Sequence, residues 1–379
     1  MSLKKIFLDN NSTTLVAKEV CDAIAEELQM PPSNPSSIHS FGQQAKSRLL
    51  KARSSIADFL GVKPEEIIFT SGGTESMNWL IQGMCSKGTK GHIITSNVEH
   101  SCVEKSLKNM ENLGWEVSLL PAGAHGAVLP SQVEGCIKKT TRLIIFGAAN
   151  SQTGVKHDIE AIANIANRHK IHFIVDGVAL FGKEPLTIPF GVSGMGFSSH
   201  KFHGPKGVGF AYIKFPYQIE PMLLGGSQEF SLRAGTENLP GIIGMAAAIN
   251  ILKTSVDANC SKVKGLRDRF EKTLQMKVCP VMINGDGPRV CNTSNLYFPG
   301  VDAETLLIQL DIHGIQASHG SACSSGSLEP SRILLSMGYS KERARSSIRF
   351  SLSRFTTEEE IEQAAGIIAQ LVAQMRALA

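Results

Sequence analysis

The sequence predicts an α/β protein with a mostly parallel sheet and a smaller α+β region at its C-terminal end. At 379 residues the chain is long enough for two or three domains. Short apolar runs alternate with amphipathic helical stretches up to about Pro240. Beyond that point a long helical pattern covers 244–276, and a short strand pattern follows at 295–298. We therefore expect a large domain of residues 15–257 and a small domain formed by 1–14 together with 258–379.

Predicted strands and helices alternate through the first half of the chain. Such βαβ units give a parallel sheet, and their right-handed crossovers bring the loops after the strands to one edge, where open α/β sheets bind ligands. In order, the predicted elements are a strand at 65–70, a helix at 74–84, a strand at 91–96, a helix at 102–110, a strand at 141–146, a helix at 158–169 and a strand at 171–176.

Composition and charge exclude several classes of protein. A net charge of +4, with scattered basic residues, argues against nucleic acid as the main partner. The sequence has no uninterrupted run of 18 apolar residues, so we expect no membrane span. The apolar run after Lys5 is too short for a signal peptide, and none of the 8 cysteines forms a CxxC pair. We expect a cytoplasmic location and reduced cysteines.

A lysine and an acid follow predicted strands. Lys201 stands in Ser-Ser-His-Lys-Phe-His-Gly-Pro-Lys-Gly, which fits either a solvated surface loop or a lysine that forms an imine with a carbonyl compound. His200 and Lys206 could lower the pKa of such an amine. Asp176 ends an apolar strand, where it is either a turn residue or a buried carboxylate that keeps the ring nitrogen of pyridoxal 5′-phosphate (PLP) protonated.

Two further segments fit either a structural or a ligand-binding role. Residues 70–76, Thr-Ser-Gly-Gly-Thr-Glu-Ser, link a strand to a helix. They form either a turn capped by Thr74 or an anion site of main-chain N–H groups at a helix N-terminus. His100 follows the strand at 91–96 and is either a core histidine or a residue that stacks on a flat ring.

Taken together, these four segments closely resemble the cysteine desulfurase family, the NifS/IscS-like branch of PLP enzymes. The resemblance extends from 8–14, Leu-Asp-Asn-Asn-Ser-Thr-Thr, to Ser-Ile-Arg-Phe-Ser at 347–351. It includes Arg-Ala-Gly-Thr-Glu-Asn at 233–238 and the Gly/Ser-rich segment at 320–331. It implies a PLP-dependent transferase of fold type I with a seven-stranded, mostly parallel sheet domain and a smaller α+β domain.

The resemblance also assigns roles within the cofactor and substrate sites. By this analogy Lys201 carries PLP, Asp176 pairs with the ring nitrogen and His100 stacks on the ring and helps to move protons. The remaining assignments are phosphate binding by Gly73, Thr74, Ser198 and His200, phosphate binding across a homodimer by Thr236, and substrate-carboxylate binding by Arg349 beside Asn150. The bidentate geometry of an arginine suits a carboxylate. No metal is implied.

Cys323 matches the family's nucleophile and lies among small Gly, Ala and Ser residues that suit a swinging loop. By analogy, L-cysteine becomes L-alanine while Cys323 takes the sulfur as a persulfide. The sulfur then passes to an acceptor protein, such as an iron–sulfur scaffold or a carrier for thio-cofactor or tRNA synthesis. The sequence does not identify the acceptor.

Two positions depart from the family pattern. Ala179 stands three residues after Asp176, where the family usually has a glutamine that donates to the PLP phenolic oxygen. The family's Asn-Asn-Glu is Asn-Ser-Gln at 150–152. Both changes bear on rate and substrate choice more than on the fold.

These departures leave alternative functions open. On the same scaffold the chain could be a selenocysteine lyase or a cysteine-sulfinate desulfinase. It could also be a weakly active relative that serves as a binding partner. An NAD enzyme is poorly supported, because residues 71–74 lack the three-glycine spacing of that class.

Overall fold

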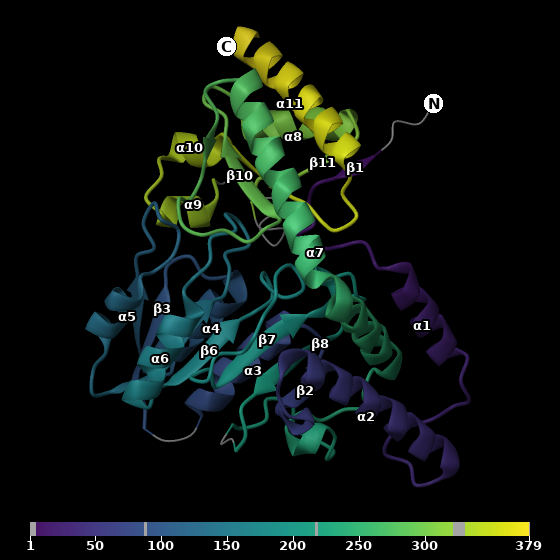
Figure 1. Cartoon of the computed structure of the whole chain (residues 1–379). Helices are drawn as coiled ribbons and strands as arrows, with labels where there is room; N and C mark the ends of the chain where they lie inside the picture. The colour runs from purple at the N-terminus through teal and green to yellow at the C-terminus, as the bar shows by residue number, and fades with distance from the viewer. Residues whose placement is uncertain (1–4, 87–88, 217–218, 321–329, 379) are drawn as a thin grey trace.

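The computed structural model describes residues 5–86, 89–216, 219–320 and 330–378. Its largest element is a seven-stranded sheet of order β2-β8-β7-β6-β5-β3-β4, in which only β8 runs antiparallel to its neighbours (Figure 1). The predicted seven-stranded, mostly parallel sheet is therefore confirmed. Its strands are β2 (Ile67–Thr70), β3 (His92–Ser96), β4 (Glu116–Leu120), β5 (Thr141–Gly147), β6 (His172–Asp176), β7 (Gly194–Ser198) and β8 (Gly209–Ile213).

Helices cover both faces of this sheet, and the strands alternate between two cores. Ile144 and Phe146 of β5 pack in one cluster, while Leu143 and Ile145 pack in the other. This period of two explains why these strands read as continuous apolar runs. The covering helices are α2 (Ser40–Leu60), α3 (Gly73–Cys85), α4 (Ser101–Asn112), α5 (Pro130–Cys136) and α6 (Ile159–His169), and α1 (Lys18–Leu28) packs against α7 (Leu239–Lys277).

A single long helix, α7 (Leu239–Lys277), joins the large sheet to a second core. Its residues up to Leu252 pack against the large sheet, and those from Val263 onward pack in the second core. Figure 1 shows α7 running out of the sheet layer and along α11 (Glu358–Leu378). By length and composition alone α7 is apolar enough to cross a membrane. Its apolar side chains, however, pack in the two cores, as expected for a core helix.

The second core has its own small sheets. An antiparallel sheet of order β12-β10-β9 lies beside a parallel β1-β11 pair. Its hydrophobic side chains come from both ends of the chain, since Ile6 and Leu8 join Phe350 and Ile368. The elements are β1 (Ile6–Phe7), β9 (Met282–Ile283), β10 (Thr293–Tyr297), β11 (Ile315–Gln316), β12 (Ser347–Ser351), α8 (Ala303–Ile312), α9 (Arg332–Ser336) and α10 (Lys341–Arg345).

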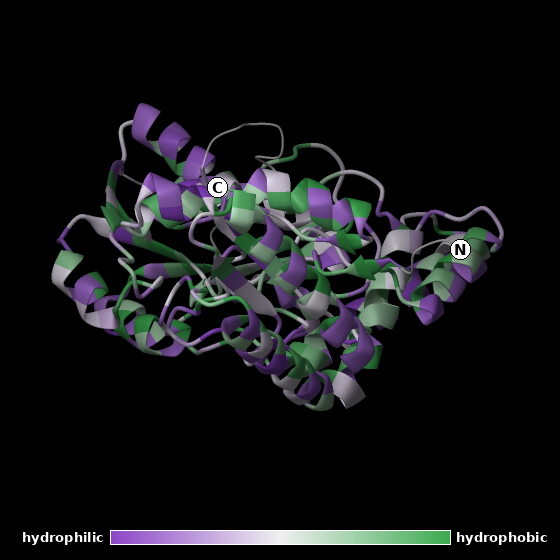
Figure 2. Cartoon of the chain, turned by 90° about the horizontal axis from the view of Figure 1, so that it is seen from above, coloured by the Kyte–Doolittle hydropathy of each residue, from purple (hydrophilic) through white to green (hydrophobic). Residues whose placement is uncertain are grey.

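Element boundaries differ from the predicted ones at a few places. Residues 64–66 form a 3-10 helix rather than the start of a strand, because Pro64 lacks the N–H that a ladder needs. The long helix begins at Leu239, five residues before the predicted pattern, because Asn238 caps it through Gly241 N–H and Pro240 fits the first turn. Figure 2 shows outer helices carrying both hydrophilic and hydrophobic residues, as amphipathic packing requires.

Candidate active site

The carboxyl ends of β2, β3, β5, β6 and β7 share one edge of the sheet, and the predicted site residues follow these ends. Cα partners show the alignment: Gly147 lies opposite Asp176, and Asp176 opposite Gly196. Gly209 of the antiparallel strand β8 lies opposite both Thr70 and Ser198. The topology thus brings together side chains that are far apart in the sequence.

The Gly-Gly segment forms a tight cradle at the N-terminus of α3. Gly72 has φ 152° and precedes the first helical residue, Gly73. A Cβ at Gly73 would lie 2.5 Å from Cγ2 of Val178, and one at Gly72 would lie 3.5 Å from Oγ of Ser198. The first N–H groups of a helix have no intrahelical acceptor. With Thr74 exposed and the Ser198 hydroxyl beside it, this cradle fits a phosphate.

The cradle is tied to the loop that contains Thr236. Arg233 donates from Nε to Oε1 of Glu75 at 2.9 Å, and Glu75 lies in the first turn of α3. Thr236, three residues after Arg233, is exposed. The role of Thr236 across a dimer stays a prediction.

Asp176 and His100 lie close together at the sheet edge. One side-chain atom from each of His100, Cys102 and Asp176 lies within 4.8 Å of the other two. Asp176 is buried, and desolvation raises its pKa, although nearby His100 and Lys201 oppose that rise. Its Oδ1 accepts the N–H of Val178 at 3.0 Å. A buried carboxylate there suits a protonated ring nitrogen.

His100 is the N-cap of α4. Its Nδ1 accepts the main-chain N–H of Cys102 at 3.2 Å, which places the proton of a neutral ring on Nε2. Desolvation lowers the pKa of His100, so the ring is neutral at neutral pH. The structure therefore gives His100 a capping role that the sequence pattern did not indicate, and it leaves Nε2 as the donor.

Lys201 follows β7 through a short 3-10 helix, and its amine meets the N-terminal segment. Nζ donates to the main-chain oxygens of Asn11 and, at 2.8 Å, Ser12. Neighbouring His200 bonds through Nδ1 to Oγ1 of Thr13 at 3.1 Å. Desolvation and then the positive charge of Lys201 lower the pKa of His200 to about 4, so His200 is neutral at pH 7.

Sequence reasoning assigned no role to residues 9–14, yet they cross the site. This segment runs from β1 in the small core to Lys201 and His200 at the large sheet. Thr14 donates its N–H to the oxygen of His200 at 3.0 Å. The run Asp-Asn-Asn-Ser-Thr-Thr directly after three apolar residues was the available signal, because so many short polar side chains in succession favour local bonding over a strand.

Arg349 lies in β12 with a side chain only 2% exposed. It donates from Nη2 to Oδ1 of Asp9 at 2.7 Å and from Nη1 to the oxygen of Ser151 at 3.2 Å. Its Nε is buried and has no hydrogen-bond partner among the described residues. This unused donor gives Arg349 capacity for a further carboxylate.

Asn150 holds a turn in place. Its Nδ2 donates to the oxygen of Val98 at 2.8 Å, and its Oδ1 accepts the N–H groups of Gln152 and Thr153. These bonds fix the loop that presents the Ser151 oxygen to Arg349. Direct substrate contact by Asn150 stays a prediction, and Cys323 lies outside the described residues.

A buried carboxyl group that sequence reasoning missed lies next to His100. Glu99 accepts hydrogen bonds from Oγ of Ser96 at 2.5 Å and from the N–H of Gly147 at 2.8 Å, and it joins the ends of β3 and β5. Desolvation raises the pKa of Glu99 to about 8. Its position after a strand, one residue before His100, was a usable signal, but burial cannot be read from the sequence.

The residues present fit PLP. A phosphate cradle, a primary amine at Lys201 and a buried carboxylate at Asp176 occupy one edge. The departure at Ala179 is equally clear, since this side chain offers no donor. The main-chain oxygen of Ala179 accepts a bond from Nζ of Lys183 at 2.9 Å.

Comparisons with known proteins agree with this arrangement. The family model described as aminotransferase class V matches residues 6–364. The chain is 40% identical over 379 residues to cysteine desulfurase IscS of Dictyoglomus turgidum, covering 99% of this chain and 96% of that protein. A solved NifS-like protein superposes with a TM-score of 0.91 at 32% identity, covering 98% and 100% of the two chains. SspA in complex with cysteine superposes with a TM-score of 0.83 at 31% identity, covering 93% and 100%.

The raised pKa of Glu99 predicts a pH-dependent effect of Glu99→Gln on stability. An unfolded glutamate titrates near 4.3. Protonated Glu99 therefore stabilises the fold fully below about pH 4, and this contribution is lost as the pH rises toward about 8. The free energy of unfolding of Glu99→Gln should rise relative to the parent across that window, by at most about 1.4 kcal/mol per pH unit.

Urea unfolding at several pH values measures this difference. Glu111→Gln is the control, because Glu111 is exposed near the end of α4, the helix that begins two residues after Glu99. The same pH trend in both variants would contradict the assignment to Glu99.

Proposed function

The chain belongs to the class V aminotransferase family of PLP-dependent enzymes, and from this premise we propose that it is a cysteine desulfurase acting on L-cysteine. The observation that carries the proposal is the meeting of Lys201, Asp176 and His100 at one sheet edge, beside a phosphate cradle. Full-length similarity to a protein named cysteine desulfurase IscS and to a structure with bound cysteine supports the substrate.

Each residue has a definite task in this proposal. PLP, when bound, supplies an electron sink at the substrate's α-carbon. Lys201 holds the cofactor and moves a proton at its Nζ, and the buried carboxylate of Asp176 keeps a proton on the ring nitrogen. His100 offers Nε2–H, while the cradle at Gly73, with Ser198, holds phosphate.

Substrate orientation depends on Arg349. Its Nη2 donates to Asp9 and its Nη1 to Ser151, but its Nε has no hydrogen-bond partner within the part of the chain that the structure describes. We place the α-carboxylate of cysteine at this guanidinium, since a buried cation with an unused donor is incompletely satisfied. In this proposal the thiolate of Cys323, a residue outside the described ranges, attacks the substrate sulfur. The S–S bond of the persulfide forms as the Cβ–S bond of the substrate breaks, and the electron pair of the broken bond stays on the carbon skeleton, which takes up a proton and leaves as alanine. The persulfide then passes its outer sulfur to an acceptor protein.

Purified protein with L-cysteine and a thiol reductant tests the activity. Equimolar sulfide and alanine are expected, and both should fall to background in Lys201→Ala. Cys323→Ala should also lose sulfide release yet keep PLP absorbance, because Cys323 does not hold the cofactor in this proposal. Undiminished turnover by Cys323→Ala would remove the nucleophile assignment.

L-Selenocysteine and L-cysteine sulfinate, run in parallel, separate the alternatives. Turnover of one of these without cysteine turnover would indicate a selenocysteine lyase or a desulfinase. Bound PLP with no turnover of any substrate would indicate a weakly active relative, to which the alanine at 179 gives some weight.

A change at Ala179 should alter the cofactor's visible spectrum. Ala179→Gln introduces a donor to the anionic phenolic oxygen of PLP, and hydrogen bonds to charged groups contribute about 1.5–3 kcal/mol. Such a bond weakens that oxygen's attraction for a proton on the nearby Lys201 nitrogen. The midpoint of the absorbance titration should therefore fall by about one pH unit. Superimposable titrations of variant and parent would count against this.

The enzyme is also proposed to be a homodimer with Thr236 reaching the partner's cofactor. The loop of residues 223–236, tied to the cradle through Arg233, exposes apolar side chains: Leu224 is 83% and Phe230 54% exposed. Apolar side chains on an exposed loop suit an interface with a second copy.

Light scattering of the parent should therefore give twice the chain mass of 40.8 kDa. Leu224→Asp with Phe230→Asp should shift this mass toward the monomer and weaken PLP retention. Leu378→Asp, at a 90% exposed site on α11, is the control. A parent that is monomeric at micromolar concentration would reject the dimer. The cytoplasmic location stays a prediction.

A further inference from the structure

A second lysine lies beside Lys201, in a place to which the proposed mechanism gives no task. Lys183 donates from Nζ to Oδ1 of Asn11 at 3.0 Å and to the oxygen of Ala179 at 2.9 Å. Lys201 donates to the main-chain oxygen of the same Asn11. The two amines therefore bond to two oxygens of one residue.

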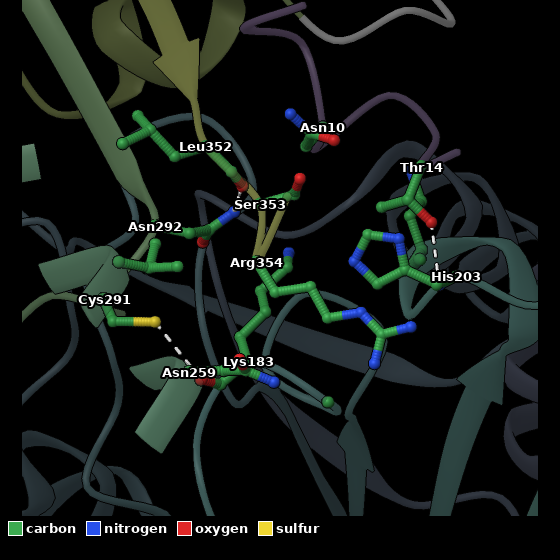
Figure 3. Close-up of a pocket in the computed structure, with 13 residues that line it drawn as sticks. Asn10, Thr14, Lys183, His203, Asn259, Cys291, Asn292, Leu352, Ser353 and Arg354 are labelled. Atoms are coloured by element: carbon green, nitrogen blue, oxygen red, sulfur yellow. Dashed lines mark hydrogen bonds between the residues drawn. The ribbon is translucent and has the colours of Figure 1, made fainter. Parts of the chain in front are cut away.

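Lys183 and Lys201 also line one small cavity of about 30 Å³. Figure 3 shows Lys183 in this pocket together with Asn10, Asn292 and Arg354. A cavity of this size has room for about one water molecule.

The charged groups around Lys183 include three cations, Lys201, Arg349 and Arg354. The two oxygens that accept hydrogen bonds from its amine, Oδ1 of Asn11 and the main-chain oxygen of Ala179, are both neutral. The carboxylate of its sequence neighbour Glu184 accepts hydrogen bonds from other groups, namely Nζ of Lys156 at 2.7 Å and the N–H of Cys291 at 2.8 Å. The titratable and charged groups around Lys183 are Lys201, Arg349, His200, His203, Arg354, Glu184 and Cys291.

We propose that Lys183 is a positioning residue for Lys201, which acts through the shared Asn11 and through its own positive charge to favour the unprotonated nitrogen at Lys201. Two ammonium groups this close disfavour each other, so a proton that leaves the Lys201 nitrogen makes a proton on Lys183 more favourable. A neighbouring cation is a known means of activating an amine toward a carbonyl group.

Electrostatics supports the same pairing. Desolvation, and after it the positive charge of Lys201, lowers the pKa of Lys183 to about 7. Because the interaction between the two charges is mutual, the charge of Lys183 likewise disfavours a proton on Lys201. Histidines 200 and 203 are largely neutral at pH 7, since desolvation lowers the pKa of each to about 4.

The inference rests on the proposed PLP site and is tested on the cofactor-loaded protein without substrate. Visible absorbance is titrated with pH in Lys183→Met, Lys183→Gln and Lys183→Arg. Both neutral variants should raise the midpoint by about one unit or more, which is a tenfold change in the protonation equilibrium. Lys183→Arg retains the charge and should stay close to the parent.

Folding should survive these changes, because Oδ1 of Asn11 still accepts from Nδ2 of Asn292 at 3.0 Å. Thermal melting checks this for each variant. Lys105→Met is the matched control: Lys105 is an exposed lysine on α4, and water screens its charge. Its midpoint should remain that of the parent.

Each other outcome has a definite meaning. Unchanged midpoints in folded Lys183→Met and Lys183→Gln would overturn the inference. An equal shift in all three Lys183 variants would also overturn it, because displacement of Asn11 rather than charge would then be the cause. Absence of cofactor absorbance in the parent itself would instead reject the proposed function.

Discussion

Asn11 is the point at which the two cores and the candidate active site are fixed to each other. Its side chain donates to the oxygen of Ser151 and to Oγ1 of Thr293, and it accepts from Lys183 and Asn292. Its main-chain N–H donates to Oγ of Ser351, and its oxygen accepts from Lys201. One buried residue thus joins β10 and β12 of the small core to the edge of the large sheet. Buried polar networks of this kind stabilise a unique arrangement only when every member is satisfied.

Desolvation dominates the electrostatics of the site. It raises the pKa of Asp176 and Glu99 and lowers that of His100 and Lys183. All four shifts favour the neutral side chain, and a pKa of about 7 still leaves Lys183 partly protonated at neutral pH. The carboxyl group of Asp176 is ionised at lower cost once a cationic ring nitrogen lies beside it.

The substrate end of the site is built differently. Arg349 is buried and already paired with Asp9, and the Asn150 turn presents the Ser151 oxygen to it. These contacts orient the guanidinium before any ligand arrives, which reduces the entropy lost on binding. Gln152 belongs to the same turn, and its Oε1 is buried without a partner among the described residues. The change from the family's glutamate at this position therefore lies in a packed part of the site.

The sequence by itself predicted the α/β class and four of the seven strands of the large sheet, and it singled out the lysine, acid, histidine and Gly-Gly segment as candidates whose roles come from the family resemblance. Those features depend on local periodicity and on short motifs after strands, which one sequence contains. β7 was missed because its Gly-Met-Gly-Phe-Ser lacks β-branched residues, and here glycines make room for side chains of α3. Only the tertiary structure decided the burial of Glu99, the crossing of residues 9–14 over Lys201 and the nearness of Lys183, since these depend on contacts between distant segments that no local pattern encodes.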